Sequence, residues 1–132
     1  MIIDIPVAKL FKMKAERVLT KRHEFSLVLD RGGSKAGRLV VVKALASGMD
    51  VARYGLVASK KVGGAVVRNR ARRRLREVIR GLKLKPGWDI VFIIRWAITT
   101  AEYSAIDREV RTLLAAGRLL LESNEESRSG TN

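Results

Sequence analysis

The segment over residues 65–80 constrains the fold more than any other part of this chain, because it is apolar on one side and rich in arginine on the other. At the 3.6 residues per turn of an α-helix, five of its apolar side chains fall within an arc of about 120° and must face a core. The arc comprises Val67, Ala71, Leu75, Val78 and Ile79. The opposite side, which is thereby forced into solvent, carries Asn69, Arg72, Arg73, Arg76 and Arg80. Arg68 projects into the apolar arc at the first turn, and we expect it to be held in position across the sheet edge.

The positive charge of the chain is concentrated around this helix. Of the 132 residues, 27 are Lys or Arg and 13 are Asp or Glu, a formal net charge of +14. Residues 53–95 hold 13 of the basic side chains and two acidic ones, so the remainder is close to neutral. Arginine predominates over residues 68–76, and its planar fork of donors suits phosphate groups. The charge predicts a local site for a polyanion, either a nucleic acid or an anionic membrane face, with a merely solvated basic face as the alternative.

Composition excludes several classes of protein. The chain has no cysteine and one histidine, His23, which removes disulfide frameworks, thiol catalysis and Cys- or His-rich metal sites. No apolar run approaches the ~20 residues that span a bilayer, and the N-terminal residues lack the pattern of a signal peptide. We therefore expect a cytoplasmic protein without a membrane partner. Because the acidic residues are scattered, the sequence predicts no catalytic side chain and no metal ligand in the protein itself.

Hydrophobic periodicity and turn residues divide the chain into one domain with two terminal segments. We expect residues 1–12 to be a disordered N-terminal extension. Alternatively, the start codon is assigned too early, and Met13 is the true first residue. Residues 13–121 form the domain, and residues 122–132 are expected to be a disordered polar tail. Within the domain the sequence predicts strands at 39–42, 54–58 and 90–94. It predicts a first helix from Thr20 to Asp30, followed by a loop over 31–37, and the second helix over 65–80. A Thr99–Glu102 capping box is expected to begin the last helix, which ends near Leu121.

The loop before the arginine-rich helix suits an anion. Lys60, Lys61 and a Gly63-Gly64 pair precede the helix, whose N-terminal N–H groups and dipole favour phosphate. Small glycines allow a backbone to approach closely. The loop is not a nucleotide-binding Walker A motif, since that spacing of Gly and Lys is absent. A plain strand-to-helix turn explains the glycines equally well.

An aromatic side chain in the first helix suggests a second kind of contact. We expect Phe25 near Lys43 and Arg53, and an aromatic ring beside basic groups can stack an unpaired base. The alternative, which the sequence alone favours, is that Phe25 is an ordinary core residue.

Residues 54–77 closely resemble the signature of the bacterial ribonuclease P protein subunit. In that family a strand ends in Ser-Lys-Lys, here Ser59-Lys60-Lys61, and Gly-x-Ala-Val-x-Arg-Asn-Arg follows, here residues 63–70. A basic helix ending in Arg-Glu completes the signature without a gap. Phe25, Val28 and Gly32 match a Phe-x-x-Val-x-x-x-Gly pattern of the family's first helix, and the resemblance extends over about residues 17–115.

The resemblance implies an α+β two-layer sandwich with a four-stranded mixed sheet and three helices, similar to a domain of a small-subunit ribosomal protein. It also implies a left-handed βαβ crossover through the helix over 65–80. Right-handed crossovers occur in about 98% of such units, so the residues alone favour the other hand.

The resemblance implies a function as well: the protein subunit of ribonuclease P, a cytoplasmic ribonucleoprotein endoribonuclease that removes the 5′ leader of precursor tRNA. The protein is expected to be a monomer, one per catalytic RNA, and magnesium ions held mainly by that RNA carry the hydrolysis. The leader-binding cleft between the first helix and the sheet is expected to be lined by Phe25, Lys43 and Arg53. The residues expected to bind the catalytic RNA are Lys60, Lys61, Arg68, Asn69, Arg70, Arg72, Arg73 and Arg76.

Two departures from the family pattern bear on the leader contacts. The family often has aromatic residues where this chain has Leu29 and Lys43, so contacts here are expected to be more electrostatic and less stacked.

Two other classes of function compete with the subunit hypothesis. A structural ribosomal-type protein shares the charge and size, and a protein-only nuclease cleaves without RNA.

Overall fold

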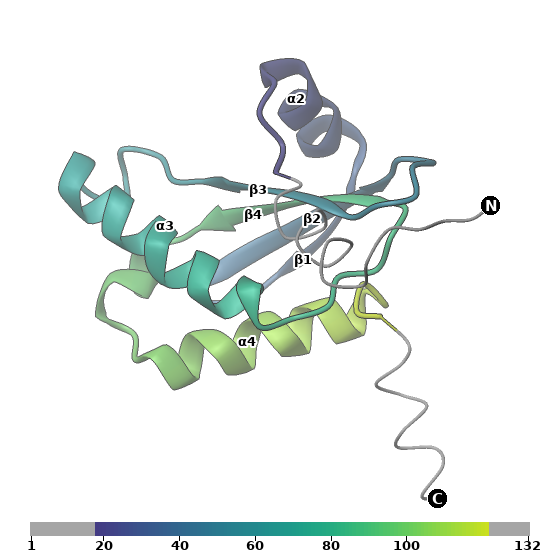
Figure 1. The fold of residues 1–132 in the computed structure, drawn as a ribbon. Coiled ribbons are helices and arrows are strands. Elements are labelled where there is room, and N and C mark those ends of the chain that lie inside the picture. The colour runs from purple at the N-terminus through teal and green to yellow at the C-terminus, as the bar shows by residue number, and fades with distance from the viewer. Residues whose placement is uncertain (1–17, 122–132) are drawn as a thin grey trace, which may run out of the picture.

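The structure is a computed structural model that describes residues 18–121. Four strands form one sheet in the order β1-β2-β4-β3 (Figure 1). β1 (Gly33–Ala36) pairs antiparallel with β2 (Val40–Ala46), and β2 pairs antiparallel with β4 (Trp88–Ile94). β3 (Arg53–Val57) pairs parallel with β4 at the far edge, so the sheet is mixed, as predicted.

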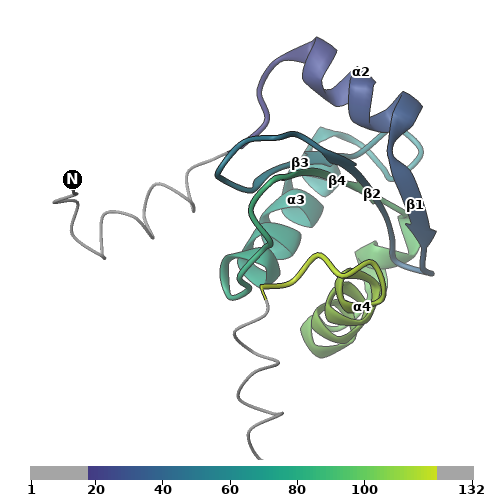
Figure 2. The same cartoon turned by 90° about the vertical axis from the view of Figure 1, so that its right-hand side faces the viewer.

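Helix α3 (Ala65–Arg80) connects the parallel strands β3 and β4. α3 and α4 (Tyr103–Ala116) lie side by side on one face of the sheet, and α2 (Arg22–Arg31) lies over the other face (Figures 1 and 2). When α3 faces the viewer and both strands point up, β4 lies to the left of β3, so the crossover is left-handed. The structure thus confirms the α+β class, the mixed sheet, the three helices and the left-handed crossover. α2 covers part of the second face of the sheet.

The two faces of the sheet bury different clusters, because side chains alternate along each strand. Towards α3 and α4 the main core gathers around Phe92 and Leu75, which are fully enclosed. Towards α2 a smaller cluster forms around Val28 and Val91. Gly32 ends α2 where a Cβ would lie 2.6 Å from the Val28 carbonyl oxygen and 2.8 Å from that of Ala44, so only glycine lets the helix end approach β2 so closely.

The helix over 65–80 has the predicted boundaries, whereas other elements differ. The segment over 31–37, expected to be a loop, contains β1, whose four residues are all exposed and give no hydrophobic alternation to detect. The first helix begins after Lys21 rather than Thr20, because Glu24 reaches back to the Lys21 backbone N–H.

The predicted Thr99–Glu102 capping box is wrong. Thr99 lies in a short 3-10 helix, η1 (Trp96–Thr100), where its hydroxyl donates to the Trp96 carbonyl at 2.9 Å. Glu102 is the N-cap of α4 but makes no side-chain cap bond. The helix also ends at Ala116, before Leu121, because Arg118 adopts a positive φ of 58° that turns the chain away.

The hairpin between β1 and β2 is fastened to α4 by one carboxylate. Glu109 accepts hydrogen bonds from the backbone N–H groups of Arg38 at 3.2 Å, Leu39 at 2.8 Å and Val40 at 2.9 Å. Gly37 leaves room for it, since a Cβ there would lie 2.2 Å from Glu109 Oε2. No helix within residues 18–121 has the length and apolar character needed to cross a membrane.

Replacing Glu109 with alanine should lower the free energy of unfolding by about 1–3 kcal/mol, because partly buried N–H donors lose their acceptor. Denaturant unfolding of Glu109→Ala measures this loss. The adjacent Arg108→Ala, which changes an exposed side chain, should stay within about 0.5 kcal/mol of the wild type. Equal effects of the two substitutions would contradict a fastening role for Glu109.

Candidate nucleic-acid interface

The structure places Arg70, Arg73, Arg76 and Arg80 of α3 on the surface by burying the other side of the helix. Ala71, Leu75, Val78 and Ile79 are buried, as the periodicity predicts. Val67, also assigned to the buried arc, is instead 38% exposed and lies in the first turn of α3. The exposed residues that were predicted to bind RNA are Lys60, Lys61, Asn69, Arg70, Arg73 and Arg76.

One hydrogen bond, one packed arginine and an uncharged helix cap organise the start of this basic face. Arg72 donates from Nη1 to the Asn69 side-chain oxygen at 2.9 Å, which orients both side chains. Arg68 is half-buried, and its Nε is enclosed without a hydrogen-bond partner. The Arg68 side chain is therefore held by packing at the helix start, and its expected position across the sheet edge stays a prediction. Gly64 caps α3 without a side-chain bond, and the first turn holds no acidic residue.

Arg74 was not singled out from the sequence, and it has a structural role. Its guanidinium donates from Nη1 to the Ile98 carbonyl at 3.2 Å and from Nη2 to the Ala101 carbonyl, which ties α3 to η1. A run of arginines gives no signal that one of them turns inward to bond backbone carbonyls, so sequence reasoning had no means of finding it.

The residues predicted for the leader-binding cleft all lie on the α2 side of the sheet. Lys43 of β2 and Gly55 of β3 both pair with Val91 of β4, so the three lie in one row across the sheet. The Phe25 ring lies over Gly55, where a Cβ would be 2.4 Å from its Cε1 and Cζ atoms. Phe25 and Lys43 therefore flank Val91 at a spacing of about 10 Å, two strand separations.

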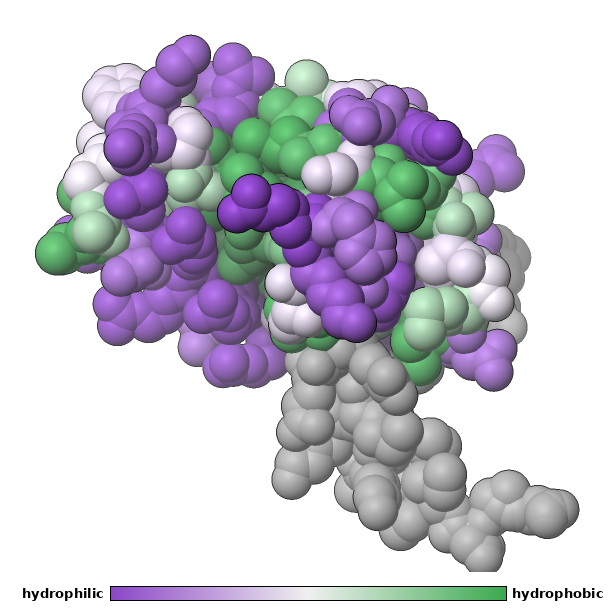
Figure 3. Space-filling model, turned by 90° about the horizontal axis from the view of Figure 1, so that it is seen from above, coloured by the Kyte–Doolittle hydropathy of each residue, from purple (hydrophilic) through white to green (hydrophobic). Residues whose placement is uncertain are grey.

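Phe25 is half-buried, so the core alternative is partly right: it packs on the cluster of Val28 and Val91 yet keeps part of its ring accessible. Val57 and Ile93 continue the same face as half-buried hydrophobic residues. Figure 3, viewed from the α2 side, shows hydrophobic surface in the middle of the molecule with hydrophilic surface around it. Phe25, Lys43, Val57 and Ile93 are called the α2-side surface below.

Arg53, the third predicted leader contact, is engaged within the protein. Its Nε and Nη2 donate to the two oxygens of Asp89 at 2.8 and 2.7 Å, and its Nη1 donates to Glu24 Oε2 at 2.9 Å. Arg53 and Asp89 are direct partners in the β3–β4 ladder, and Glu24 comes from α2. Arg53 therefore fixes α2 against the sheet and sets the position of Phe25, a role that leaves its guanidinium less free for a phosphate.

The ion pairs shift the pKa values of two of these groups. The hydrogen bond to Asp89 raises the pKa of Arg53 above its already high ordinary value. Burial alone would raise the pKa of Glu24, but the Lys21 backbone N–H and the Arg53 guanidinium outweigh it and hold that pKa below the ordinary value of 4.5. The carboxylate form of Glu24 is thus the form that stabilises the fold.

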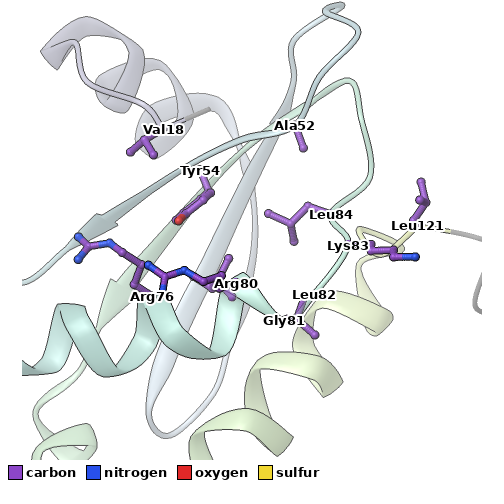
Figure 4. A pocket seen from close by; sticks show the side chains of 11 residues that line it. Val18, Ala52, Tyr54, Arg76, Arg80, Gly81, Leu82, Lys83, Leu84 and Leu121 are labelled. Atoms are coloured by element: carbon purple, nitrogen blue, oxygen red, sulfur yellow. The ribbon is translucent and has the colours of Figure 1, made fainter. Parts of the chain in front are cut away.

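A pocket of about 420 Å³ lies on the opposite face of β3, and no sequence pattern indicates it. Tyr54 of β3 reaches it together with Arg76 and Arg80 of α3, as Figure 4 shows. Tyr54 alternates with Gly55, so this pocket is separated by the sheet from the α2-side surface. Across residues 18–121, no group of three or more His, Cys, Asp or Glu side chains could hold a metal ion.

The stabilisation from Glu24 should depend on pH. Since its pKa is lowered by folding, its contribution is complete above about 4.5 and is lost as the pH falls through the lower folded value. The urea midpoint of Glu24→Gln should therefore lie below that of the wild type near neutral pH, and the gap should close in acid. A gap that is constant across the acid range would contradict the ion pair with Arg53.

Comparison with known proteins agrees with this arrangement. The family model described as Ribonuclease P matches residues 13–117. A ribonuclease P protein component from Dehalococcoides mccartyi is 46% identical over 117 residues, covering 89% of this chain and 98% of that protein. One from Clostridioides difficile is 39% identical over 99 residues, covering 73% of this chain and 87% of that protein.

Solved structures show the same fold. The RNase P protein of Thermotoga maritima superposes with a TM-score of 0.66 at 31% identity, covering 73% of this chain and 93% of that one. A mutant RNase P protein of Staphylococcus aureus gives a TM-score of 0.73 at 25% identity, covering 88% and 100%. The family signature over residues 54–77 forms the strand, turn and basic helix that the resemblance implied, and the family model spans most of the chain. The chain belongs to the ribonuclease P protein family.

Proposed function

We propose that this chain is the protein subunit of a ribonucleoprotein ribonuclease P, which binds the catalytic RNA and the 5′ leader of precursor tRNA and assists endonucleolytic removal of the leader. One observation carries the proposal: the apolar side of α3 is buried, so most of its arginines are fixed on the surface of a chain whose family is ribonuclease P. The assembly that we propose is one protein per RNA, in the cytoplasm.

The catalytic RNA docks on the basic face of α3 and the turn before it. Arg70, Arg73 and Arg76 are exposed on a rigid helix, and Lys60 and Lys61 extend the same charge onto the preceding turn. Arginine forks bind phosphate oxygens in pairs, and a helix holds them at fixed spacings. Arg68, held by packing, and the Asn69–Arg72 pair supply contacts of defined direction.

The single-stranded leader lies along the α2-side surface. Phe25 offers a partly exposed ring for one base, and Lys43 lies two strands away as a cation for the phosphate backbone. Arg53 acts through position, because its guanidinium is held by Asp89 and Glu24. With Leu29 and Lys43 at positions where relatives often carry aromatic residues, electrostatic attraction contributes more here than stacking.

The hydrolysis is carried by magnesium ions held mainly by the RNA. The described residues offer no carboxylate cluster for a metal ion, whereas they offer many cations. The protein contributes positive charge, which raises substrate affinity and lowers the magnesium concentration that the RNA requires. The family match favours this assignment over a ribosomal-type structural protein.

Alanine at Arg70 should weaken docking of ribonuclease P RNA by about 1–3 kcal/mol, the range for charge-assisted hydrogen bonds. The slope of log affinity against log salt should also fall by about one, because one phosphate contact is lost. Arg68→Ala should weaken docking similarly and also lower stability, since its side chain is half-buried. Filter binding over a salt series measures both quantities.

The matched control for Arg70→Ala is Arg108→Ala, which removes an exposed arginine from α4 and should leave affinity and slope unchanged. An unaltered dissociation constant for Arg70→Ala would remove this residue from the interface. A flat salt dependence of the wild type would show that the basic face does not bind RNA at all.

Alanine at Phe25 should reduce the preference of the reconstituted complex for precursor over mature tRNA by about 1–3 kcal/mol, the range for one base–aromatic stack. Leu27→Ala is the control, because Leu27 lies on the same helix and is 43% exposed but is not part of the α2-side surface. Both affinities are measured in one preparation, so a loss of folded protein changes them equally and leaves their ratio unaffected. An unchanged ratio in Phe25→Ala would exclude the ring as a leader contact.

A further inference from the structure

Exposed hydrophobic side chains gather at one end of the molecule, outside the surfaces assigned above. Val66 is 73% exposed, Trp96 63% and Tyr103 52%, and the half-exposed Val67 adjoins them. They belong to the first turn of α3, the first residue of η1 and the first residue of α4. Figure 1 shows that α3 and α4 begin at the same end of the molecule and run in the same direction.

Contacts between the elements place these residues beside the basic helix. Arg74 of α3 bonds the carbonyls of Ile98 and Ala101, so the side of α3 that carries Arg74 faces η1. Arg70 and Val67 precede Arg74 by four and seven residues and therefore lie on that same side, one and two turns nearer the helix start. The exposed Arg70 thus lies along the helix side next to the segment that begins with Trp96. Val66, Val67, Arg70, Trp96 and Tyr103 are called the Trp96 surface.

The charge around the Trp96 surface indicates an anionic partner. Arg95 precedes Trp96, and its exposed side chain is anchored by a 3.1 Å bond from Nη1 to the Gly37 carbonyl. Between residues 95 and 103 the one acidic side chain is Glu102. A second copy of this chain fits poorly, because each copy carries a net charge of +14 and would repel the other. Unpaired RNA bases combine flat apolar faces with phosphate charge, which is what this surface complements.

We propose that Trp96 and Tyr103 stack unpaired bases of the catalytic RNA, so that the RNA contact of α3 continues onto η1 and the start of α4. The inference rests on the proposed function, because it needs the RNA to dock on α3. Exposed tryptophan and tyrosine rings present stacking faces at little conformational cost. Arg70, which belongs to the same surface, holds the phosphate backbone. In this arrangement α3 supplies the charge, and η1 and the start of α4 supply the stacking.

The first test is the affinity of the full chain for ribonuclease P RNA over a salt series. Trp96→Ala should weaken binding by roughly 5- to 150-fold, the effect of losing one base–aromatic stack. The salt slope should not change, because stacking releases no counterions, whereas Arg70→Ala reduces the slope. Trp96→Phe keeps an aromatic face and should retain most of the affinity. Met49→Ala, a change at a residue that is 41% exposed in the turn between β2 and β3, should have no effect.

The second test uses the fluorescence of Trp96 itself. The chain has two tryptophans, so Trp88→Phe leaves Trp96 as the sole tryptophan emitter. Addition of ribonuclease P RNA should quench and shift its emission, while Trp96→Phe, which leaves the half-buried Trp88, should respond little. Both variants are conservative, and circular dichroism verifies that each is folded.

The outcomes separate this inference from the proposed function. Salt-dependent RNA binding that Trp96→Ala leaves unchanged, with no quenching of Trp96, would overturn the stacking role and leave the proposed function intact. A wild type that does not bind the RNA would overturn both. A dimer in sedimentation velocity that Trp96→Ala dissociates, without a change in RNA affinity, would instead assign the Trp96 surface to self-association.

Discussion

The apolar arc of α3 packs under the sheet with Leu75 and Val78 almost fully enclosed, and the arginines on the other side of the helix have no position available except the surface. Burying each such aliphatic side chain contributes about 1.5–3 kcal/mol. Repulsion between arginines one turn apart costs only a few tenths of a kcal/mol per pair. Burial therefore exceeds repulsion, and the helix holds a dense set of like charges in a fixed arrangement.

Two polar networks join the remaining layers to this unit. Arg53 connects β3, β4 and α2 through Asp89 and Glu24, so the helix that carries Phe25 is oriented by charge as well as by packing. Glu109 joins α4 to the β1–β2 hairpin. Each network uses a charged group with several hydrogen bonds in a partly buried place, where such bonds are stronger than at an exposed surface. The basic face of α3 and the α2-side surface are thus held on one rigid frame.

How far the sequence predicts this structure depends on how each element is specified. The helix over 65–80 is predicted to the residue, because its periodicity arises from burial on one side. β1 is missed, since all its residues are exposed and its pairing with β2 is what makes it a strand. The left-handed crossover follows from the family resemblance alone, because local patterns favour the common hand.

In the candidate interface, too, features that follow from local burial could be predicted, whereas those that depend on distant residues could not. The arginine stripe could be predicted because the core on its opposite side determines it. The engagement of Arg53 with Asp89 and Glu24, and of Arg74 with η1, could not, because these contacts join residues 24 to 36 positions apart. Trp96 follows a buried strand and lacks any local sign of exposure, so its surface became visible only in three dimensions.

The most direct test of the account is cleavage of precursor tRNA at low magnesium by this protein alone, by a bacterial ribonuclease P RNA alone, and by both together. The account predicts cleavage at the mature 5′ end in the combined reaction only, with the RNA active by itself at high magnesium. Cleavage by the protein alone would place a nuclease site in the chain. Failure of the protein to assist an RNA that is active at high magnesium would contradict its role as the subunit.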